Sequence, residues 1–230
     1  MLDRTHRAEA AIRASSVVVG YKHYLNHIAD LTEGKELLSS GMRQEVDRCR
    51  VALDRAQAGA TVAFVSSGDA GVYGMAGLAI EMAAAHGMNI PIEIVPGVSA
   101  ANSAAARLGA PLMLDYACVS LSDLLMPWDT IRRRIEALAQ ADMVVALYNP
   151  KSTKRIHQIE EVAAIFRQHR SGKTPVGIAT AVGAADEHFL MSDLDRFLGE
   201  EITMKSIVIV GNSSSKILDG WFVTPRGYKV

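Results

Sequence analysis

The sequence predicts an α/β fold with a parallel sheet in its N-terminal half and a mixed sheet in its C-terminal half. Apolar runs typical of strands alternate with amphipathic segments typical of helices along all 230 residues. The first half alternates strongly, as parallel sheets covered by helices do. In the second half more strands are adjacent in sequence, and this pattern favours a mixed sheet.

Each helix and strand of the first half is predicted from its local sequence pattern. Short apolar runs are typical of buried strands, whereas apolar residues at helical spacing or alanine-rich runs indicate helices. Gly59 ends one such helix, as glycine often does at a helix C-terminus. In chain order we expect a helical pattern at the N-terminus, a strand at residues 17–19, a helix at 42–58, a strand at 61–66, a helix at 75–86, a strand at 90–95 and a helix at 101–108.

The second half carries the same signals in a different order. Pro127 opens a helix, because proline is well tolerated at a helix start. The Gly-Ala-Pro sequence at residues 109–111 ends the preceding helix and marks the expected domain boundary. We therefore expect domains at residues 1–111 and 112–230. In chain order we expect a strand at 116–121, a helix at 127–140, a strand at 143–148, a helix at 156–169, strands at 176–181 and 207–210 with a hairpin around 187–191 between them, and a last strand at 221–223.

Composition and charge argue against several classes of partner. The chain has 24 basic and 25 acidic residues and a formal net charge of −1, so it lacks the overall basic field that binds nucleic acid. No apolar run reaches the ~18 residues that a transmembrane helix needs. The polar N-terminus does not read as a signal peptide. We therefore expect neither a nucleic-acid partner nor a membrane partner.

The cysteines and histidines do not indicate a metal centre. Cys49 and Cys118 are the only cysteines and form no CxxC pair, so we expect neither a disulfide framework nor a zinc site. This cysteine usage fits a reducing cytoplasm. The seven histidines are scattered, and each is interpreted as a surface or packing residue. We expect a cytoplasmic protein without a metal ion.

The most informative segment is SSGDAGVYGMAG at residues 66–77, between a predicted strand and a predicted helix. Its glycines recur at every third position, and such a cluster suggests that a ligand approaches the backbone closely. A strand, a glycine loop and a helix N-terminus together form a common nucleotide-binding corner. The segment contains Asp69 and no basic residue. It therefore suits a neutral or cationic nucleoside, such as S-adenosylmethionine (SAM), better than a phosphate group.

A simpler interpretation of this loop stays open. Asp69 would only cap the helix, and the glycines would only allow tight packing of helix against strand. A second turn at residues 96–100, Pro-Gly-Val-Ser-Ala, also leads from a predicted strand into a helix with small side chains. Ligands of open α/β sheets gather at the carboxyl ends of strands. A plain helix cap by Ser99 is the alternative explanation of this turn.

No nucleophile–base pair and no paired carboxylates can be read from the sequence. Methyl transfer from a sulfonium to an electron-rich carbon does not need such groups, because it depends mainly on positioning two reactive molecules. Cations at segment ends suit the carboxylates of an acidic ligand, although solvated surface charge is the alternative for each. These cations are Lys22, His23, Lys151, Lys154, Arg155 and Arg226.

Six segments spread over nearly the whole chain form a recognisable set. They are SSGDAGVYGMAG, VPGVSAANSAAARLGAPL, SLSDLLMPW, LYNP, TMKSIVIVG and TPRGY, in this order. Together they resemble the tetrapyrrole (corrin and porphyrin) methyltransferase family. Use of SAM and a GDxxxYG loop are common to the whole family, whereas SLSDLLMPW and LYNP resemble segments of its C17-methylating branch in particular.

The resemblance implies the two-domain α/β tetrapyrrole methyltransferase fold, a homodimer, and SAM bound between the domains. The expected reaction is methylation of C17 of precorrin-3B or cobalt-precorrin-3 with ring contraction to (cobalt-)precorrin-4 in cobalamin (vitamin B12) biosynthesis. S-adenosylhomocysteine is the expected product of the cofactor. No catalytic residue is assigned.

The residues that match the family motifs are the expected site residues. For SAM they are Ser67, Gly68, Asp69, Val72, Ser99, Ala100, Tyr148, Asn149, Val182, Thr203 and Met204. In the family, SAM is held largely by backbone groups at such positions. For the carboxylates of the tetrapyrrole, the expected contacts are Lys22, Lys154 and Arg226.

The start of the sequence departs from the family pattern. Family members begin with an apolar strand and a GxGPGD-type loop on the tetrapyrrole side, whereas this sequence starts in the first helical pattern. We expect a form extended by that strand to be more stable and more active. Two alternatives therefore stay open: a related family methyltransferase with another acceptor, and a non-catalytic protein that binds SAM or a corrinoid.

Overall fold

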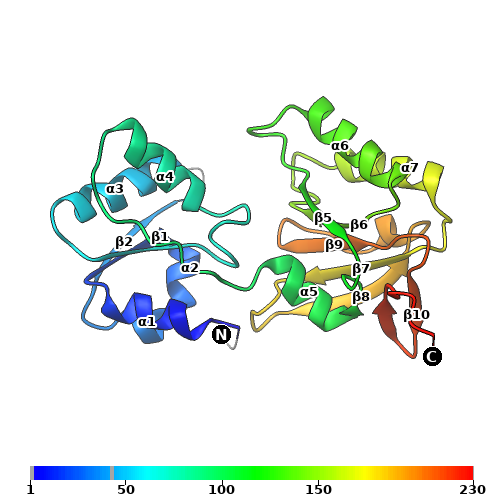
Figure 1. Ribbon diagram of the computed structural model, residues 1–230, viewed down its shortest axis with the longest axis horizontal. Coiled ribbons are helices and arrows are strands. Elements are labelled where there is room, and N and C mark those ends of the chain that lie inside the picture. Colours follow the sequence, from blue (N-terminus) through cyan, green and yellow to red (C-terminus); the bar gives the residue numbers. More distant parts are fainter. Residues whose placement is uncertain (1–2, 42–43, 230) are drawn as a thin grey trace. The chain divides into compact units, whose positions relative to one another are not determined.

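The computed structural model describes residues 3–41 and 44–229 and confirms the predicted α/β fold (Figure 1). The chain divides into two compact units, Met1–Ser99 and Ala100–Val230. The predicted boundary at residue 111 lies later than this division. The helix α5 (Ala100–Leu108) belongs to the second unit because Ala104 and Leu108 pack in that unit's core.

The first unit is a parallel sheet with helices on both faces. Its strands lie in the order β2-β1-β3, and both pairings are parallel. Figure 1 shows α3 and α4 on one side of this sheet and α1 and α2 on the other. The elements in chain order are α1 (His6–Ala14), β1 (Val17–Tyr21), α2 (Lys22–Asn26), a 3₁₀ turn (Ala29–Leu31), β2 (Glu36–Ser40), α3 (Glu45–Gln57), β3 (Val62–Val65) and α4 (Ala76–Ala85).

Alternation along β1 decides which helices cover which face. Val18 is fully buried and packs with Ile12 of α1 and Leu25 of α2. Its neighbours Val17 and Val19 point to the opposite face, where they pack with Ala52 of α3. Both faces of the sheet are therefore buried, as expected of a parallel sheet.

One prediction in this unit is wrong, and one strand was missed. Residues 90–95 were expected to form a strand, but they pair with no strand among the described residues, and Ile92 and Ile94 are about 40% exposed. That prediction is wrong because a strand requires a ladder partner, which apolar content alone does not supply. The strand β2 was not predicted. The helix expected at residues 42–58 is found as α3, and positions 42–43 lie outside the described residues.

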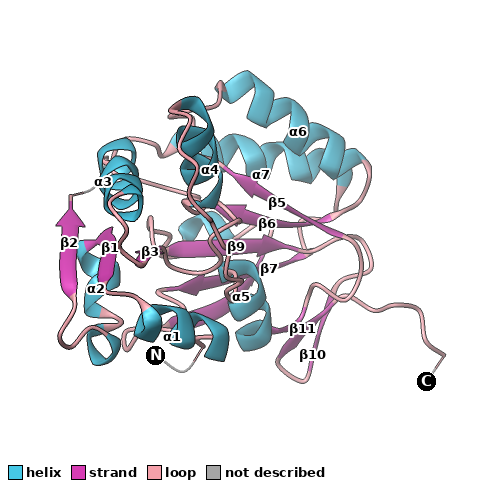
Figure 2. Cartoon of the chain, turned by 60° about the vertical axis from the view of Figure 1, so that its left-hand side comes forward, coloured by secondary structure: helices cyan, strands magenta, loops and turns pink. Residues whose placement is uncertain are grey.

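The second unit contains a five-stranded mixed sheet in the order β5-β6-β9-β7-β8, which confirms the predicted sheet type. β5 and β6 are parallel, and the other pairings are antiparallel. Residues 187–191, expected as a hairpin, lie mostly within β8, which pairs with β7. Figure 2 shows its strands side by side. The elements are β5 (Tyr116–Ser120), α6 (Trp128–Gln140), β6 (Val144–Tyr148), α7 (His157–His169), β7 (Pro175–Thr180), β8 (His188–Asp193), a 3₁₀ turn (Phe197–Gly199) and β9 (Ser206–Val210).

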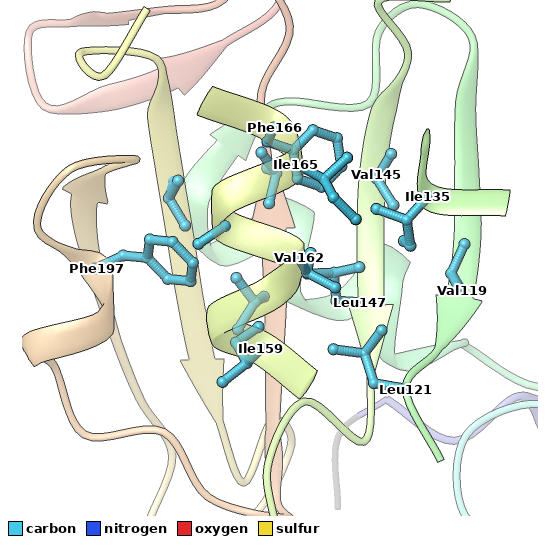
Figure 3. Close-up of a cluster of buried hydrophobic side chains, with 14 of the residues drawn as sticks. Val119, Leu121, Ile135, Val145, Leu147, Ile159, Val162, Ile165, Phe166 and Phe197 are labelled. Carbon is cyan, nitrogen blue, oxygen red and sulfur yellow. The ribbon is translucent and has the colours of Figure 1, made fainter. Parts of the chain in front are cut away.

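The larger core of the chain lies between this sheet and the helices α6 and α7. Figure 3 shows Ile159, Val162 and Phe166 of α7 lying over Val145 and Leu147 of β6. Fully burying one such side chain contributes about 1.5–3 kcal/mol. This face therefore provides a rigid support for the loops at the strand ends.

The opposite face of the mixed sheet is covered by α5 and by a small second sheet. That sheet has the order β10-β11-β4, with β4 (Gly109–Ala110), β10 (Lys216–Leu218) and β11 (Trp221–Val223), and β11 is the last strand expected from the sequence. Phe222 of β11 is fully buried in this layer. Among the described residues, no helix is both long enough and apolar enough to span a bilayer.

Candidate cofactor and substrate site

The glycine loop starts where β3 ends, and its backbone permits close contact. Gly68 has a φ of +68°, a conformation that L side chains rarely adopt. A Cβ at Gly97 would overlap the carbonyl oxygen of Gly68, so only glycine lets the second turn lie against the first. The two turns that the sequence singled out therefore meet within the first unit.

Asp69 holds these two turns together. Its carboxylate accepts hydrogen bonds from the backbone N–H of Gly71 at 2.8 Å and of Gly97 at 2.9 Å. The bonds from Gly97 and Gly71 lower the pKa of Asp69 below its ordinary value because they favour the charged form. The structure thus shows Asp69 fixing the loop, and its contact with SAM stays a prediction.

Ser66 is the first residue of the segment at residues 66–77 and was not among the site residues expected from the sequence. Its hydroxyl oxygen is buried and meets no hydrogen-bond partner among the residues that the structure describes. A buried hydroxyl without a partner is unfavourable, so a polar ligand lying on the loop would satisfy it. Ser67, Gly68 and Val72 are exposed in the loop, which carries no basic side chain. These features fit a nucleoside that is neutral or cationic, as SAM is.

A pocket of about 470 Å³ opens at the carboxyl ends of β1 and β2. The parallel register sets Tyr21, the last residue of β1, opposite Ser40, the last residue of β2. Lys22, a predicted substrate contact, lies on its wall. This is the sheet edge at which ligands of parallel sheets gather. The lining residues are Tyr21, Lys22, His23, Asn26, Ser39, Ser40 and Gly41.

In the second unit, strand pairing gathers the remaining predicted SAM contacts. β6 ends beside the start of β9, and Thr180 at the end of β7 lies opposite Ser206 of β9. The segments that follow these ends therefore lie at one edge of the mixed sheet. Ala100 starts α5, directly after Ser99, and both residues are half-buried. The predicted contacts at the sheet edge are Tyr148, Asn149, Val182, Thr203 and Met204.

Hydrogen bonds fix the end of β6. The backbone N–H of Ala101 donates to the hydroxyl of Tyr148 at 3.0 Å, which satisfies an N–H in the first turn of α5. Asn149 has a φ of +49° and donates through Nδ2 to Ser120 Oγ at 3.0 Å. Arg155 donates to the carbonyl oxygen of Asn149 at 2.6 Å. Ser120 was missed by the sequence analysis because this contact spans two separate strand ends.

The loop after β7 and the loop before β9 contact one another. The N–H of Ala181, which has a φ of +52°, donates to the carbonyl oxygen of Lys205 at 3.1 Å. Val182 packs against the core beneath α5. Between these loops Thr203 is half-buried, whereas the side chain of Met204 is 50% exposed. The edge thus presents backbone groups and apolar surface, which suits a nucleoside.

The other two predicted substrate cations lie in irregular segments. Lys154 is exposed in the loop before α7. Arg226 is exposed in the C-terminal segment, with its guanidinium 6.0 Å from the ring centroid of Tyr228. Neither contact with a tetrapyrrole is tested by this geometry, and both stay predictions.

Comparison with known proteins identifies the family. The sequence model of the protein family Tetrapyrrole (Corrin/Porphyrin) Methylases matches residues 3–197 of this chain. The chain belongs to this family. Its fold is likewise that of the solved structure titled "Crystal structure of the methyltransferase CobJ", with a TM-score of 0.91, 35% identity, and coverage of 96% of this chain and 93% of that one. The resemblance seen in the sequence motifs is therefore confirmed.

Relatives point to one branch of the family. The chain is 47% identical to a "Cobalt-factor III methyltransferase" of Priestia megaterium over 98% of its own length, although it spans only 42% of that longer protein. It is 41% identical to a "Probable cobalt-factor III C(17)-methyltransferase" of Salmonella typhimurium, covering 97% of this chain and 93% of the relative. Both names agree with the branch that SLSDLLMPW and LYNP indicated.

Proposed function

We propose that the chain is a SAM-dependent methyltransferase of cobalamin biosynthesis that methylates C17 of cobalt-factor III, with contraction of the macrocycle. The observation that carries this proposal is the high identity, over nearly the whole chain, to two relatives named for cobalt-factor III methylation. These names favour a cobalt-bearing substrate over the metal-free precorrin-3B that the sequence analysis left open. The loops at the strand ends support the use of a nucleoside cofactor.

The residues around the glycine loop would hold SAM by hydrogen bonds and close contact rather than by ion pairs. Bound SAM would supply an electrophilic methyl group on its sulfonium. Ser66 has a hydroxyl group without a hydrogen-bond partner, and Gly68 has no side chain, so a ligand could contact its backbone directly. Asp69 keeps the loop in place through Gly71 and Gly97. Such preorganised positioning is the main contribution that the chain makes to methyl transfer.

The proposal is tested by incubating the purified chain with cobalt-factor III and SAM that carries an isotope-labelled methyl group. We expect a product heavier by one methyl group, with the label attached to C17 in its NMR spectrum. A parallel reaction with precorrin-3B decides between the cobalt-bearing and the metal-free substrate. SAM binding without methyl transfer to either compound would instead favour the non-catalytic alternative.

Replacing Gly68 by alanine should lower the affinity for SAM at least about tenfold, which corresponds to about 1.4 kcal/mol. The added methyl group would face a ligand lying on the backbone. Gly87→Ala is the matched control, because Gly87 has a similar φ of +62° and no atom within 4 Å of an added Cβ. Both variants carry the same backbone strain of about 1–2 kcal/mol. Isothermal titration with SAM that shows equal affinities for the two variants would contradict the placement of the cofactor.

Cations are proposed to select the tetrapyrrole through its acetate and propionate groups. Replacing Lys22, Lys154 or Arg226 by alanine should raise KM for the tetrapyrrole and leave KM for SAM unchanged. Lys22 should show the largest effect, because it lines the pocket at the ends of β1 and β2. Lys216→Ala, at an exposed position of β10, serves as the control. Unchanged tetrapyrrole kinetics in all three variants would remove these residues from the site.

We further propose that the protein is a homodimer that works in the cytoplasm. Exposed apolar side chains on β8 and on the β10–β11 hairpin, such as Phe189 at 49% and Trp221 at 56%, suit a subunit interface. The chain has only two cysteines, Cys49 and Cys118, and no CxxC pair, which suits a reducing compartment.

A further inference from the structure

We propose that His23 and His27 form a binding site for a free divalent transition-metal ion beside the pocket of Lys22. This inference goes beyond the proposed methyl transfer and does not depend on it. From the sequence each histidine was expected to be a surface or packing residue, and no HxxxH spacing was expected; that expectation is wrong, because His23 and His27 have this spacing. In the structure the two imidazole rings face one another, with one Nε2 within hydrogen-bond distance of the other.

The geometry of the two imidazole rings suits a single metal ion. His23 lies in α2 and His27 directly follows it, so the i, i+4 spacing puts both rings on one face of the turn. Their Nε2 atoms lie 3.1 Å apart. With each nitrogen about 2.0–2.1 Å from an ion, this separation corresponds to an N–metal–N angle of about 100°. That angle lies between the values for octahedral and tetrahedral coordination.

The pair is held by its surroundings. Leu25 and Ile28, on either side of His27 in sequence, are buried in the core of the first unit and anchor the turn. The rings of Tyr21 and Tyr24 lie 6.3 Å and 6.4 Å from the ring of His23. A turn whose backbone is anchored in this way reduces the entropy that metal binding would otherwise cost. His23 is exposed at the pocket, so an ion can reach the pair from solvent.

The chemistry of the ligands indicates the class of ion. Two neutral imidazoles favour Zn²⁺, Ni²⁺, Co²⁺ or Cu²⁺ over the hard ions Mg²⁺ and Ca²⁺. Among the described residues no group of three or more potential metal ligands gathers, so water or the carboxylate of a bound molecule would complete the coordination. Lys22 on the same pocket wall would help to hold such a carboxylate.

The site is suited to a free ion rather than to cobalt inside a tetrapyrrole. A metal ion in such a macrocycle is bound by the four ring nitrogens and keeps open positions only on opposite faces of the ring. The two imidazole nitrogens converge from the same side at about 100°. They cannot both reach an ion that is already enclosed by the ring.

The test is isothermal titration of the untagged full chain with Zn²⁺ and Ni²⁺, without SAM or tetrapyrrole. We expect one ion per chain, and a loss of affinity of at least about tenfold in both His23→Ala and His27→Ala, because even altering a residue behind a metal ligand costs about 10–100-fold. His86→Ala is the control, since His86 bonds to the carbonyl oxygen of Met82 at 2.8 Å, away from this turn. Unchanged binding in both variants, or equal loss in the control, would overturn the proposal.

The absorption spectrum of the Co²⁺ complex provides a second readout that does not depend on affinity. Imidazole ligation should give visible d–d bands in the native chain that disappear in the double variant His23→Gln/His27→Gln. Glutamine keeps a polar side chain of similar size, so the turn stays folded. Bands that persist in the double variant would overturn the proposal, whatever the chain methylates.

Discussion

Replacing Arg170 by methionine is expected to destabilise the second unit by about 3–5 kcal/mol, as losing one partner of a buried charged network does. The side chain of Arg170 is fully buried and lies 4.5 Å from the ring centroid of Phe166. Its guanidinium donates hydrogen bonds to the carbonyl oxygens of Gly211 and Met143, the latter at 2.7 Å. Methionine fills a similar volume but leaves these carbonyl groups without a donor, and each such buried group costs about 1–3 kcal/mol.

Chemical denaturation of the purified chain measures this loss. Arg132→Met is the control, because Arg132 pairs with Glu136 on the surface of α6 and is 40% exposed. Exposed pairs of this kind contribute about 0–1 kcal/mol. Arg170→Lys should lie closer to the methionine variant than to the native chain, since one ammonium group cannot replace the planar donor array. A loss in Arg170→Met no larger than that in Arg132→Met would contradict the assigned role.

Elements with a clear hydrophobic pattern could be predicted from the sequence, whereas the buried contacts of Arg170 could not. The valine-rich run of β6 and the amphipathic pattern of α6 were predicted within a residue or two, because hydrophobic periodicity reflects the burial that forms them. By contrast, Glu36-Leu37-Leu38-Ser39-Ser40 lacks a clear apolar run, so β2 was missed. Its strand identity comes from pairing with β1, which is a tertiary contact.

Residues 90–95 show the opposite failure. The run around Ile92 and Ile94 has the composition of a strand, yet pairing decides whether a strand exists, and no described residues supply it. The expected domain boundary at residue 111 lies after the division of the structure between residues 99 and 100. The sequence at residues 109–111 does end the helix α5, but the packing of Leu108 decides to which unit this helix belongs.

The candidate site was predictable where backbone conformation limits the choice of residue. Gly68 and Gly97 were noticed because clustered small residues mark close approach. The bond between Asp69 and Gly97 joins residues 28 positions apart and could not be read from either segment alone. The same holds for the unsatisfied hydroxyl of Ser66, which depends on what surrounds it. The His23–His27 spacing, however, was visible in the sequence and was overlooked.

Replacing Asp69 by asparagine should reduce both SAM affinity and methyl transfer strongly, because it breaks the link between the two turns. One amide oxygen can replace only one of the two carboxylate acceptors, so Gly71 or Gly97 loses its bond. A bond to a charged group contributes about 1.5–3 kcal/mol when buried, and less at this partly exposed position. Asp115→Asn, at an exposed position in the second unit, is the control.

The pH dependence of stability provides a separate check on Asp69. The pKa of its carboxyl group is lower in the folded chain than its ordinary value. The stabilisation is therefore complete above the pKa of the unfolded chain, about 3.9, and is lost as the pH falls through the lower folded value. The difference in free energy of unfolding between native and Asp69→Asn chains should be constant near neutrality and shrink in acid. A difference that grows in acid would contradict the assignment.

A double-mutant cycle separates positioning from direct contact with the cofactor. Gly97→Ala should push the two turns apart, because its Cβ would overlap the carbonyl oxygen of Gly68. If Asp69 acts through Gly97, either change alone removes the same arrangement, and the double variant should bind SAM no more weakly than the worse single variant. If Asp69 instead contacts SAM by itself, the two losses should add. Fully additive losses would therefore show that the carboxylate does more than hold the loop.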